Sequence, residues 1–287
     1  MYIYSPNGIK DILSKYGYFL SAKRGQNYLV NESIAQKIVS LIKDTVYNQS
    51  NYKVLEVGSG LGAITIPLSM NFEKVLSIEV DKGISKCLED VLNYYKIHNV
   101  KVINKDFLKI PLDDIRDFAS KDTIFVSNLP YSIGGEILRK VIYDFEIEHL
   151  FVMVQREFFD RIKAKKGSKN YSFLSVIMQL NTQKMVKLVD VSRNNFFPVP
   201  SVDSTFIYLQ KSNKILDKQS SVMIQRLFST RRKSILNSVG NLLGGNKKKA
   251  EEIIRRLGIK GNERLENFDP WSIKELISNI IVEYYQI

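Results

Sequence analysis

Two hydrophobic patterns alternate along the first two thirds of the chain. Short apolar runs bounded by turn-forming residues are typical of buried strands. They occur at Lys53–Val57, Lys74–Val80, Val100–Asn104, Thr123–Ser127 and Leu150–Val154. Amphipathic stretches separate them and predict helices at Ser33–Ile42, Gly83–Tyr95 and Gly134–Tyr143. Because strands that alternate with helices form a parallel sheet covered on both faces, we expect an α/β fold that binds its ligand beyond the carboxyl ends of the strands.

The pattern changes near Gln210. A last strand-like run, Thr205–Leu209, is followed by a largely polar stretch from Lys211 to Ser220. Beyond it, apolar residues at helical spacing predict helices at Val222–Phe228, Ile235–Val239, Lys248–Leu257 and Ser272–Ile280. We therefore expect two domains, an α/β domain over residues 1–210 and a small α-helical domain over residues 211–287.

Composition narrows the class of protein. The formal net charge of +12 favours a nucleic-acid partner, because cationic surfaces release counterions when they bind polyanions. An anionic membrane surface and a plainly solvated lysine-rich surface are the alternatives. No apolar run approaches the about 18 residues of a membrane span, and the N-terminus lacks the pattern of a secretory signal. The single cysteine, Cys87, excludes an internal disulfide and a cysteine-rich zinc site, so we expect a cytoplasmic protein without a metal.

A glycine-rich loop, Glu56–Gly62, begins in the first strand and continues past its end. Glycines there permit a tight turn and close approach of the backbone to a ligand, although a plain strand-to-helix turn would show the same pattern. Glu79 ends the second strand 19 residues after Gly60, near the spacing at which an acid meets a ribose hydroxyl. Asp106 follows the third strand, where it would accept a hydrogen bond from an adenine amino group or cap a turn.

Two classes of cofactor fit such a loop. A dinucleotide fingerprint reads Gly-x-Gly-x-x-Gly, whereas the third glycine here is Gly62 and the next residue is Ala63. The leading Glu56 and the acid after the third strand, Asp106, favour S-adenosylmethionine instead. A nicotinamide dehydrogenase is the enzyme alternative that these residues alone leave open.

The fourth strand ends in Asn128-Leu129-Pro130-Tyr131, a pattern with a chemical reason. An exocyclic adenine amine is a poor nucleophile, because its lone pair is delocalised into the ring. The Asn128 side-chain oxygen and the Leu129 carbonyl, whose direction Pro130 fixes, would each accept one amino hydrogen and favour a more tetrahedral nitrogen. Tyr131 offers a flat face on which a flipped base stacks. The other interpretation is a strand-end turn, which the upstream loop and acids disfavour.

A second compact block runs from Asn195 to Ser204 and contains two prolines that make it rigid. Phe196 or Phe197 would close the other side of the base pocket, and we expect Phe196 to belong to the catalytic site. For Phe197, a hydrophobic anchor beneath a proline-rich loop is an equally good interpretation.

Taken together, these residues resemble the ribosomal RNA adenine N6-dimethyltransferases, and among them the small-subunit KsgA/RsmA family. The resemblance extends from about Phe19 to Trp271. Ser59 departs from the pattern, because many members have proline there. The matching blocks are Lys23–Leu29, Glu56–Gly62, Glu79, Asp106, Asn128–Tyr131, Gln155–Glu157, Tyr171–Ser175, Phe196–Ser204 and Phe228–Lys233.

The resemblance implies a Rossmann-like S-adenosylmethionine-dependent methyltransferase sheet with a small C-terminal α-helical domain that binds RNA. The implied substrate is 16S rRNA in the small ribosomal subunit or its late precursor. Two adjacent adenosines in the hairpin near the 3′ end would each be dimethylated at N6, and we expect a monomer. The implied cofactor contacts are those of Asn27, the Leu29 backbone, Gly58, Gly60, Glu79, Asp106 and Asn128.

Two other functions stay open. An Erm-type 23S rRNA adenine N6-methyltransferase is similar in the same blocks, and neither Phe196–Ser204 nor the helical tail separates the two. A catalytically silent RNA-binding factor of ribosome assembly is the non-enzymatic alternative. The intact Asn128, Pro130 and Tyr131 argue against it, because a silent protein does not need them.

Three basic segments are candidates for phosphate contacts, with a solvated charged surface as the alternative. They are Arg161–Lys169, Arg231–Lys233 and Lys247–Lys249. The first ends in an expected loop.

Reversing the charge of Lys163, Lys165 and Lys166 to Glu should weaken RNA binding and flatten its dependence on salt, because fewer counterions are then released. The measurement is the affinity for ribosomal RNA over a series of salt concentrations. An unchanged salt slope would count against phosphate contacts by this segment.

Overall fold

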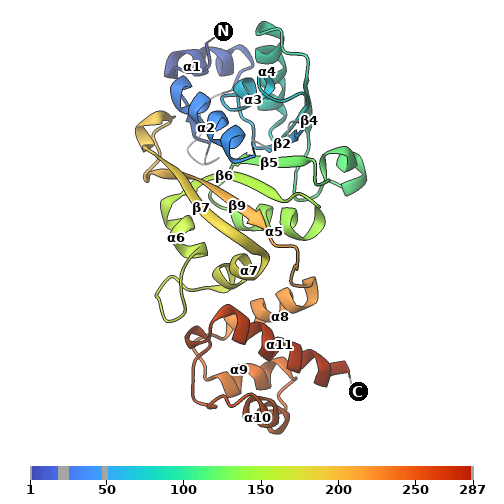
Figure 1. The fold of residues 1–287 in the computed structure, drawn as a ribbon. Helices are drawn as coiled ribbons and strands as arrows, with labels where there is room; N and C mark the ends of the chain where they lie inside the picture. Colours follow the sequence, from blue (N-terminus) through green and yellow to red (C-terminus); the bar gives the residue numbers. More distant parts are fainter. Residues whose placement is uncertain (1, 19–25, 47–50, 286–287) are drawn as a thin grey trace. The chain divides into compact units, whose positions relative to one another are not determined.

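The computed structural model describes residues 2–18, 26–46 and 51–285, which form two compact units (Figure 1). Unit 1 comprises Met1–Arg156 and Lys184–Lys211, and unit 2 comprises Glu157–Gln183 and Ser212–Ile287. The sequence predicts two consecutive pieces, whereas these units are interleaved, because residues 157–183 cluster with the C-terminal helices. The assignment of catalysis to residues 1–210 and of RNA binding to residues 211–287 stays a prediction.

Helices and strands alternate through most of unit 1. The helices of the chain are α1 (Pro6–Lys15), α2 (Glu32–Thr45), α3 (Thr65–Ser69), α4 (Lys82–Tyr94), α5 (Gly134–Asp144), α6 (Arg156–Ile162), α7 (Phe173–Asn181), α8 (Lys218–Ser229), α9 (Ile235–Leu242), α10 (Lys247–Arg256) and α11 (Pro270–Tyr285). The strands are β1 (Tyr28–Leu29), β2 (Lys53–Val57), β3 (Val75–Glu79), β4 (Val100–Asn104), β5 (Thr123–Asn128), β6 (His149–Gln155), β7 (Thr182–Val191), β8 (Phe196–Phe197) and β9 (Ser204–Lys211).

The predicted elements are confirmed, with ends that shift by a few residues. The predicted strands are β2 to β6 and β9, and the predicted helices are α2, α4, α5 and α8 to α11. The hydrophobic pattern missed α1, α3, α6, α7 and β7. Strand β7 lies at the edge of the sheet and is partly or largely exposed along most of its length, so it lacks the apolar run that reveals a buried strand.

Unit 1 is built around a seven-stranded sheet in the order β4-β3-β2-β5-β6-β9-β7. The strands from β4 to β6 are parallel, and β9 runs antiparallel to β6. The chain moves outward from β2 through β3 to β4 and then returns to β5, on the other side of β2. This reversal produces a crevice at the carboxyl ends of β2 and β5, where open α/β sheets bind ligands.

The central strands are buried on both faces, which explains their continuous apolar runs. Successive residues of a strand point to opposite faces. Val54, Val126 and Phe151 accordingly share one core with apolar residues of α1, α2 and α4. The neighbouring residues Leu55 and Phe125 are also fully buried, and their side chains point to the other face of the sheet, where Figure 1 shows α5.

Side chains fix the points at which several helices begin, by accepting hydrogen bonds from otherwise unpaired backbone N–H groups. The Asn31 side chain accepts a bond from the N–H of Ile34 before α2. The Asp81 carboxylate accepts bonds from the N–H groups of Gly83 and Ile84 before α4. Helix α4 therefore begins immediately after the strand that ends at Glu79.

In unit 2, hydrogen bonds of side chains join the inserted segment 157–183 to the C-terminal helices. The Tyr171 hydroxyl donates to the Phe268 carbonyl at 2.9 Å, and Arg231 Nη1 donates to the Tyr171 carbonyl at 3.3 Å. The Asn181 side-chain oxygen accepts from the Leu216 N–H at 2.7 Å. Helices α7, α8 and α11 pack against one another, and α9 packs against α10.

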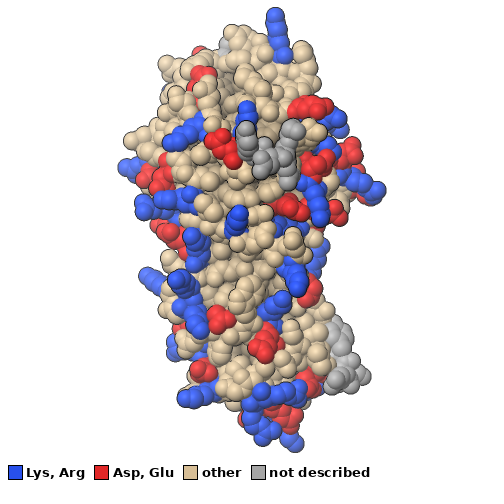
Figure 2. Space-filling view, in the orientation of Figure 1, with Lys and Arg blue, Asp and Glu red and all other residues tan. Residues whose placement is uncertain are grey.

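Charge is divided unevenly between the units. The segments of unit 2 contain 19 Lys and Arg residues and 10 Asp and Glu residues, so they account for +9 of the net +12. Figure 2 shows basic side chains over one whole face of the protein, with acidic side chains among them. Among the residues that the structure describes, no helix is both long enough and apolar enough to cross a membrane.

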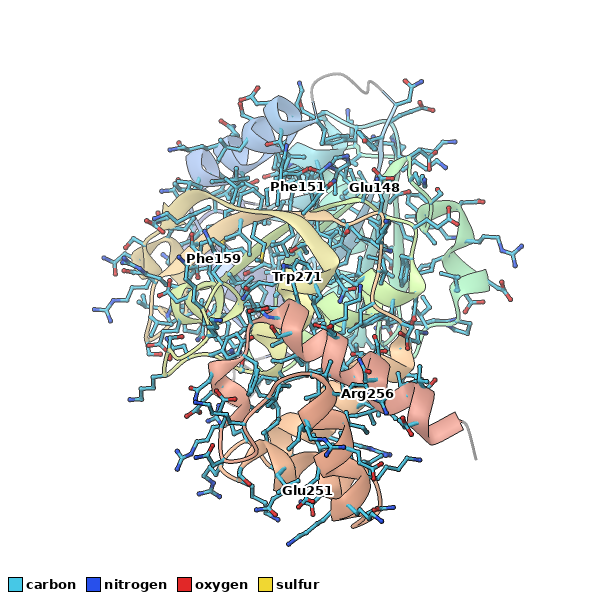
Figure 3. The ribbon with its side chains drawn as sticks, turned by 60° about the horizontal axis from the view of Figure 1, so that its bottom comes forward. Glu148, Phe151, Phe159, Glu251, Arg256 and Trp271 are labelled. Carbon is cyan, nitrogen blue, oxygen red and sulfur yellow. The ribbon has the colours of Figure 1, made fainter. Side chains whose placement is uncertain are left out.

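The sheet core allows a test of the fold. Phe151 is fully buried, with its ring stacked on those of Phe206 and Tyr208 (Figure 3). We expect Phe151→Ala to lower the free energy of unfolding by about 3 to 5 kcal/mol, because it removes a buried ring and leaves a cavity. Urea denaturation followed by circular dichroism measures this. The matched control is Val186→Ala on β7, where the side chain is exposed and a loss above about 0.5 kcal/mol is not expected.

Candidate active site

A cavity of about 450 Å³ opens in unit 1 at the carboxyl ends of β2, β3 and β5. This is the place that the strand order indicates for a ligand. Ten of the residues that the sequence predicts for the site line it together: Asn27, Leu29, Gly58, Gly60, Glu79, Asp106, Asn128, Leu129, Pro130 and Tyr131. Lys23, Arg24 and Gly25, from the first matching block, lie outside the described residues.

The glycine loop lies against the end of β5. Val57 pairs with Ser127 in the parallel ladder, and the Ser127 hydroxyl donates to the Val57 carbonyl at 2.7 Å. Gly58 has φ +74°, and a Cβ added there would lie 3.7 Å from the Asn128 carbonyl oxygen. Gly60 has φ +56°, and a Cβ there would lie 3.4 Å from the Tyr28 ring. Both Cβ distances are ordinary contacts, so it is the positive φ and not a lack of space that favours glycine at these two positions.

A hydroxyl pair ties the same loop to the neighbouring strand. The Ser77 hydroxyl on β3 donates to the Ser59 hydroxyl at 2.6 Å, and both side chains are buried. Ser59 is the position at which the sequence departs from the proline of many family members. A buried hydrogen bond therefore restrains the loop here.

Glu79 connects the loop to β3 through its carboxylate. Its Oε2 accepts a hydrogen bond from the Gly60 N–H, and its Oε1 accepts one from the Asp81 N–H, both at 3.0 Å. Burial raises the pKa of Glu79, and these backbone hydrogen bonds oppose the rise. An ionised carboxylate offers about four lone-pair positions, so it keeps acceptor capacity toward the cavity.

Glu56 is a second buried carboxyl in the cavity wall. It is 3% exposed, and the Thr65 hydroxyl donates to its Oε2 at 2.6 Å. Burial raises the pKa of Glu56 to about 7, and the charge of Glu79 adds to the rise, while the hydrogen bond from Thr65 opposes it. The wall formed by Glu56 and Glu79 is therefore suited to a ligand that brings positive charge.

Asp106 takes one of the two roles that its sequence position suggested, that of a turn cap, and the hydrogen bond to an adenine amino group stays a prediction. Its Oδ1 accepts a hydrogen bond from the Leu108 N–H at 3.0 Å and so caps the turn after β4. Its Oδ2 lies 3.6 Å from Nζ of the exposed Lys109. The half-buried side chain nevertheless lines the cavity. It follows β4, which β3 separates from β2 and the glycine loop.

The segment Asn128–Tyr131 leaves the sheet at the same edge. The Leu129 N–H donates to the Met153 carbonyl of β6 at 3.0 Å, which fixes the backbone one residue after β5 ends. Asn128 and Tyr131 are half-buried. Burial raises the pKa of Tyr131, and a hydrogen bond with the Ser204 hydroxyl opposes the rise. Ser204, the last residue of the second compact block, thus lies beside Tyr131.

The structure does not place Phe196 at the cavity. Its side chain is 2% exposed and belongs to the core of unit 1, because Phe196 pairs with Leu29 in the small β1–β8 sheet and points inward. Phe197 points the other way and is half-buried, with Nζ of Lys10 5.4 Å from the centre of its ring. The Phe196 ring therefore cannot contact a base in this conformation. Of the two rings, that of Phe197 is the one with exposed surface.

Sequence reasoning missed the apolar part of the lining. Val80, Leu108 and Ile133 also border the cavity. Apolar residues at strand ends have no chemical signature in a sequence. Val80 illustrates this, because in the sequence it continues the apolar run of a buried strand, whereas in the structure it is 67% exposed.

Comparison with known proteins identifies relatives along nearly the whole chain. The ribosomal RNA adenine dimethylase family matches residues 20–281. A protein of Geobacillus thermodenitrificans named ribosomal RNA small subunit methyltransferase A is 33% identical over 99% of this chain and 99% of its own length. The protein of that name from Malacoplasma penetrans is 34% identical over 98% of both chains.

Two solved structures have a similar fold. A dimethyladenosine transferase from Plasmodium falciparum has a TM-score of 0.68 and 23% sequence identity, covering 89% of this chain and 96% of its own. The 23S rRNA methyltransferase ErmE has a TM-score of 0.58 and 24% identity, covering 88% of this chain and 99% of its own. These two likenesses show an α/β methyltransferase fold. Because the family match spans residues 20–281 and the relatives cover almost all of the sequence, the chain belongs to the ribosomal RNA adenine dimethylase family.

Proposed function

We propose that this protein transfers methyl groups from S-adenosylmethionine to N6 of adenosines in small-subunit ribosomal RNA. One observation carries the proposal: a single cavity is lined both by the acids suited to the cofactor and by the residues suited to an adenine amine. The relatives at 33% to 34% identity are named small-subunit methyltransferases, which favours the small subunit over the large one.

The lining fits the cofactor in three places. The free lone pairs of Glu79 would accept hydrogen bonds from the two ribose hydroxyls, and Asp106 would accept one from the adenine amino group. Gly58 and Gly60 leave their backbone open to the methionine part of the cofactor. Asn27 and the Leu29 backbone would hold the cofactor from the N-terminal side of the chain. The bound cofactor supplies a methyl group on a positively charged sulfur, and buried carboxyls at Glu56 and Glu79 favour that charge.

Asn128 and Leu129 would prepare the adenine amine. The Asn128 side-chain oxygen accepts one amino hydrogen and the Leu129 carbonyl accepts the other, which localises the nitrogen lone pair for attack. Tyr131, which lines the same cavity, would supply the face on which the flipped base stacks. The nitrogen would bond to the methyl carbon as the bond from carbon to sulfur breaks, which leaves a neutral thioether, and the methylated amine would then lose one proton to solvent. Positioning and charge complementarity suffice for this reaction, because a sulfonium is a good leaving group.

The proposal extends to the substrate position. The protein would dimethylate two adjacent adenosines in the 3′-terminal hairpin of 16S rRNA, late in assembly of the small subunit, acting as a monomer in the cytoplasm. The resemblance of the matching blocks supports this extension. The excess of basic residues in unit 2 supports a role of residues 211–287 in binding that RNA.

Incubating the protein with isolated small and large ribosomal subunits and labelled S-adenosylmethionine should label small-subunit RNA, and mass spectrometry of that RNA should find N6,N6-dimethyladenosine. Label in the large subunit alone would instead identify an Erm-type methyltransferase. No label in either subunit would indicate a silent binding factor.

The variant Asn128→Ala tests the role of this side chain in the same methyl-transfer experiment. We expect methyl transfer to fall by about 100-fold or more, while the fold and binding to the subunit persist, because a preorganised polar contact to the reacting group is removed. The matched control is Asn194→Ala, which removes the same side chain at an exposed position outside the cavity lining. Full activity of the Asn128 variant would refute the role assigned to it.

Affinity for S-adenosylmethionine should rise from about pH 6 to about pH 8. The pKa of Glu56 is about 7 in the empty protein, so the carboxyl is mostly protonated below that pH. A bound cation favours the ionised form, so binding at low pH releases a proton and is weaker there. Calorimetric titration in two buffers of different ionisation enthalpy counts the protons released.

Glu56→Gln is the control for this pH dependence. It keeps the shape and removes the titration, so proton release near pH 7 should disappear and the affinity at about pH 8 should drop. Titration of the cofactor itself is common to both proteins and cancels in the comparison. Equal proton release by the two proteins would contradict the assignment to Glu56.

A further inference from the structure

Trp271 is the only tryptophan of the sequence, and it is exposed. Its exposed fraction is 60%, although a tryptophan side chain is large and mostly apolar. Helix α11 buries Ile273, Leu276, Ile277 and Ile280 along one side. Because successive residues turn by about 100° around a helix, Trp271 lies about 160° away from Ile273, on the opposite side. Packing of α11 therefore does not explain this indole, which lies in the first turn of the helix (Figure 3).

The segment before Trp271 is attached to a basic loop of unit 2. The Gly167 N–H donates to the Glu266 carbonyl at 2.7 Å, and Lys166 Nζ lies 3.3 Å from Asp269 Oδ2. The other oxygen of that carboxylate, Oδ1, accepts the Ser272 N–H at 3.0 Å in the first turn of α11. The loop and the start of the helix are thus fixed side by side.

The loop that is bonded to this segment is basic. Lys165 and Lys169 are exposed on the same loop, beside Lys166, and Arg264 is exposed just before the segment. Two acids of this region, Asp269 and Glu266, each lie within 4.0 Å of one of its cations, and Glu275 is exposed one turn after Trp271 on α11. An exposed ring among cations is the combination that binds single-stranded nucleic acid, in which the ring stacks on a base and the cations follow the phosphates.

We propose that Trp271 is a stacking platform for an unpaired base of the RNA substrate, with Lys165 and Lys169 holding the adjacent phosphates. The choice of RNA rests on the proposed function, and the placement rests on the exposed indole and its basic surroundings. Unpaired bases are required, because paired bases in a duplex do not offer a free face.

The indole itself reports the contact. Titrating a short oligoadenylate into the full-length protein at low salt should quench tryptophan fluorescence, since no other tryptophan contributes to the signal. An RNA duplex of the same length should quench it much less. Vesicles that contain an anionic phospholipid should leave the fluorescence unchanged.

Variants separate stacking from charge. Trp271→Ala should weaken oligoadenylate binding by about tenfold without changing its salt slope, and Trp271→Phe should restore part of the affinity. Lys165→Gln combined with Lys169→Gln should instead lower the slope by about 0.7 for each phosphate that the protein no longer neutralises. Val282→Ala is the matched control, because Val282 is also exposed on α11, about 20° from Trp271 around the helix axis.

Several outcomes would overturn this inference. They are the absence of quenching by oligoadenylate, equal quenching by the duplex, a response to vesicles without one to RNA, and unchanged affinity of Trp271→Ala. Methyl transfer to small subunits by the wild-type protein, measured in parallel, keeps the two proposals apart. Transfer without quenching rejects the platform alone, and quenching without transfer rejects the proposed reaction alone.

Discussion

The parallel register between β2 and β5 is the constraint on which the site depends. Val57 lies opposite Ser127, and the Ser127 hydroxyl binds the Val57 carbonyl, so the glycine loop and Asn128 leave the sheet at the same level. A slip of one residue would exchange the two faces of one whole strand, disrupt its packing on both sides, and move Asn128 away from the level of the loop. The hydrophobic sheet therefore fixes, by its own packing, the distance between the glycine loop and the Asn128–Tyr131 segment.

Electrostatics gives the cavity its preference among ligands. Two carboxyls, Glu56 and Glu79, are buried in its wall, and burial raises the pKa of both. Removing carboxylates from water opposes folding unless they are protonated, hydrogen-bonded or paired with positive charge. Thr65 and two backbone N–H groups satisfy part of this requirement. The proposed cationic cofactor would satisfy the rest, so the cost that these acids impose on folding would become affinity for the ligand.

Charge and chemistry occupy different units. Unit 1, which contains the cavity, is close to neutral, with 23 basic and 20 acidic residues, whereas unit 2 has nearly twice as many basic as acidic ones. Long-range attraction of a polyanion and local orientation of one base are different physical tasks. The first needs many solvated cations, and the second needs a few rigid groups in a dry cavity.

The sequence by itself determined the central strands and the site residues at their ends. Buried parallel strands show as apolar runs, and the carboxyl ends of such strands meet at one edge, so Gly58, Glu79, Asp106 and Asn128 were predictable as neighbours. Only the tertiary structure decided that residues 157–183 join the C-terminal helices, that Phe196 points inward, and that Trp271 stays exposed. Local patterns report how a residue relates to its own helix or strand, whereas these outcomes depend on which distant segments cover it.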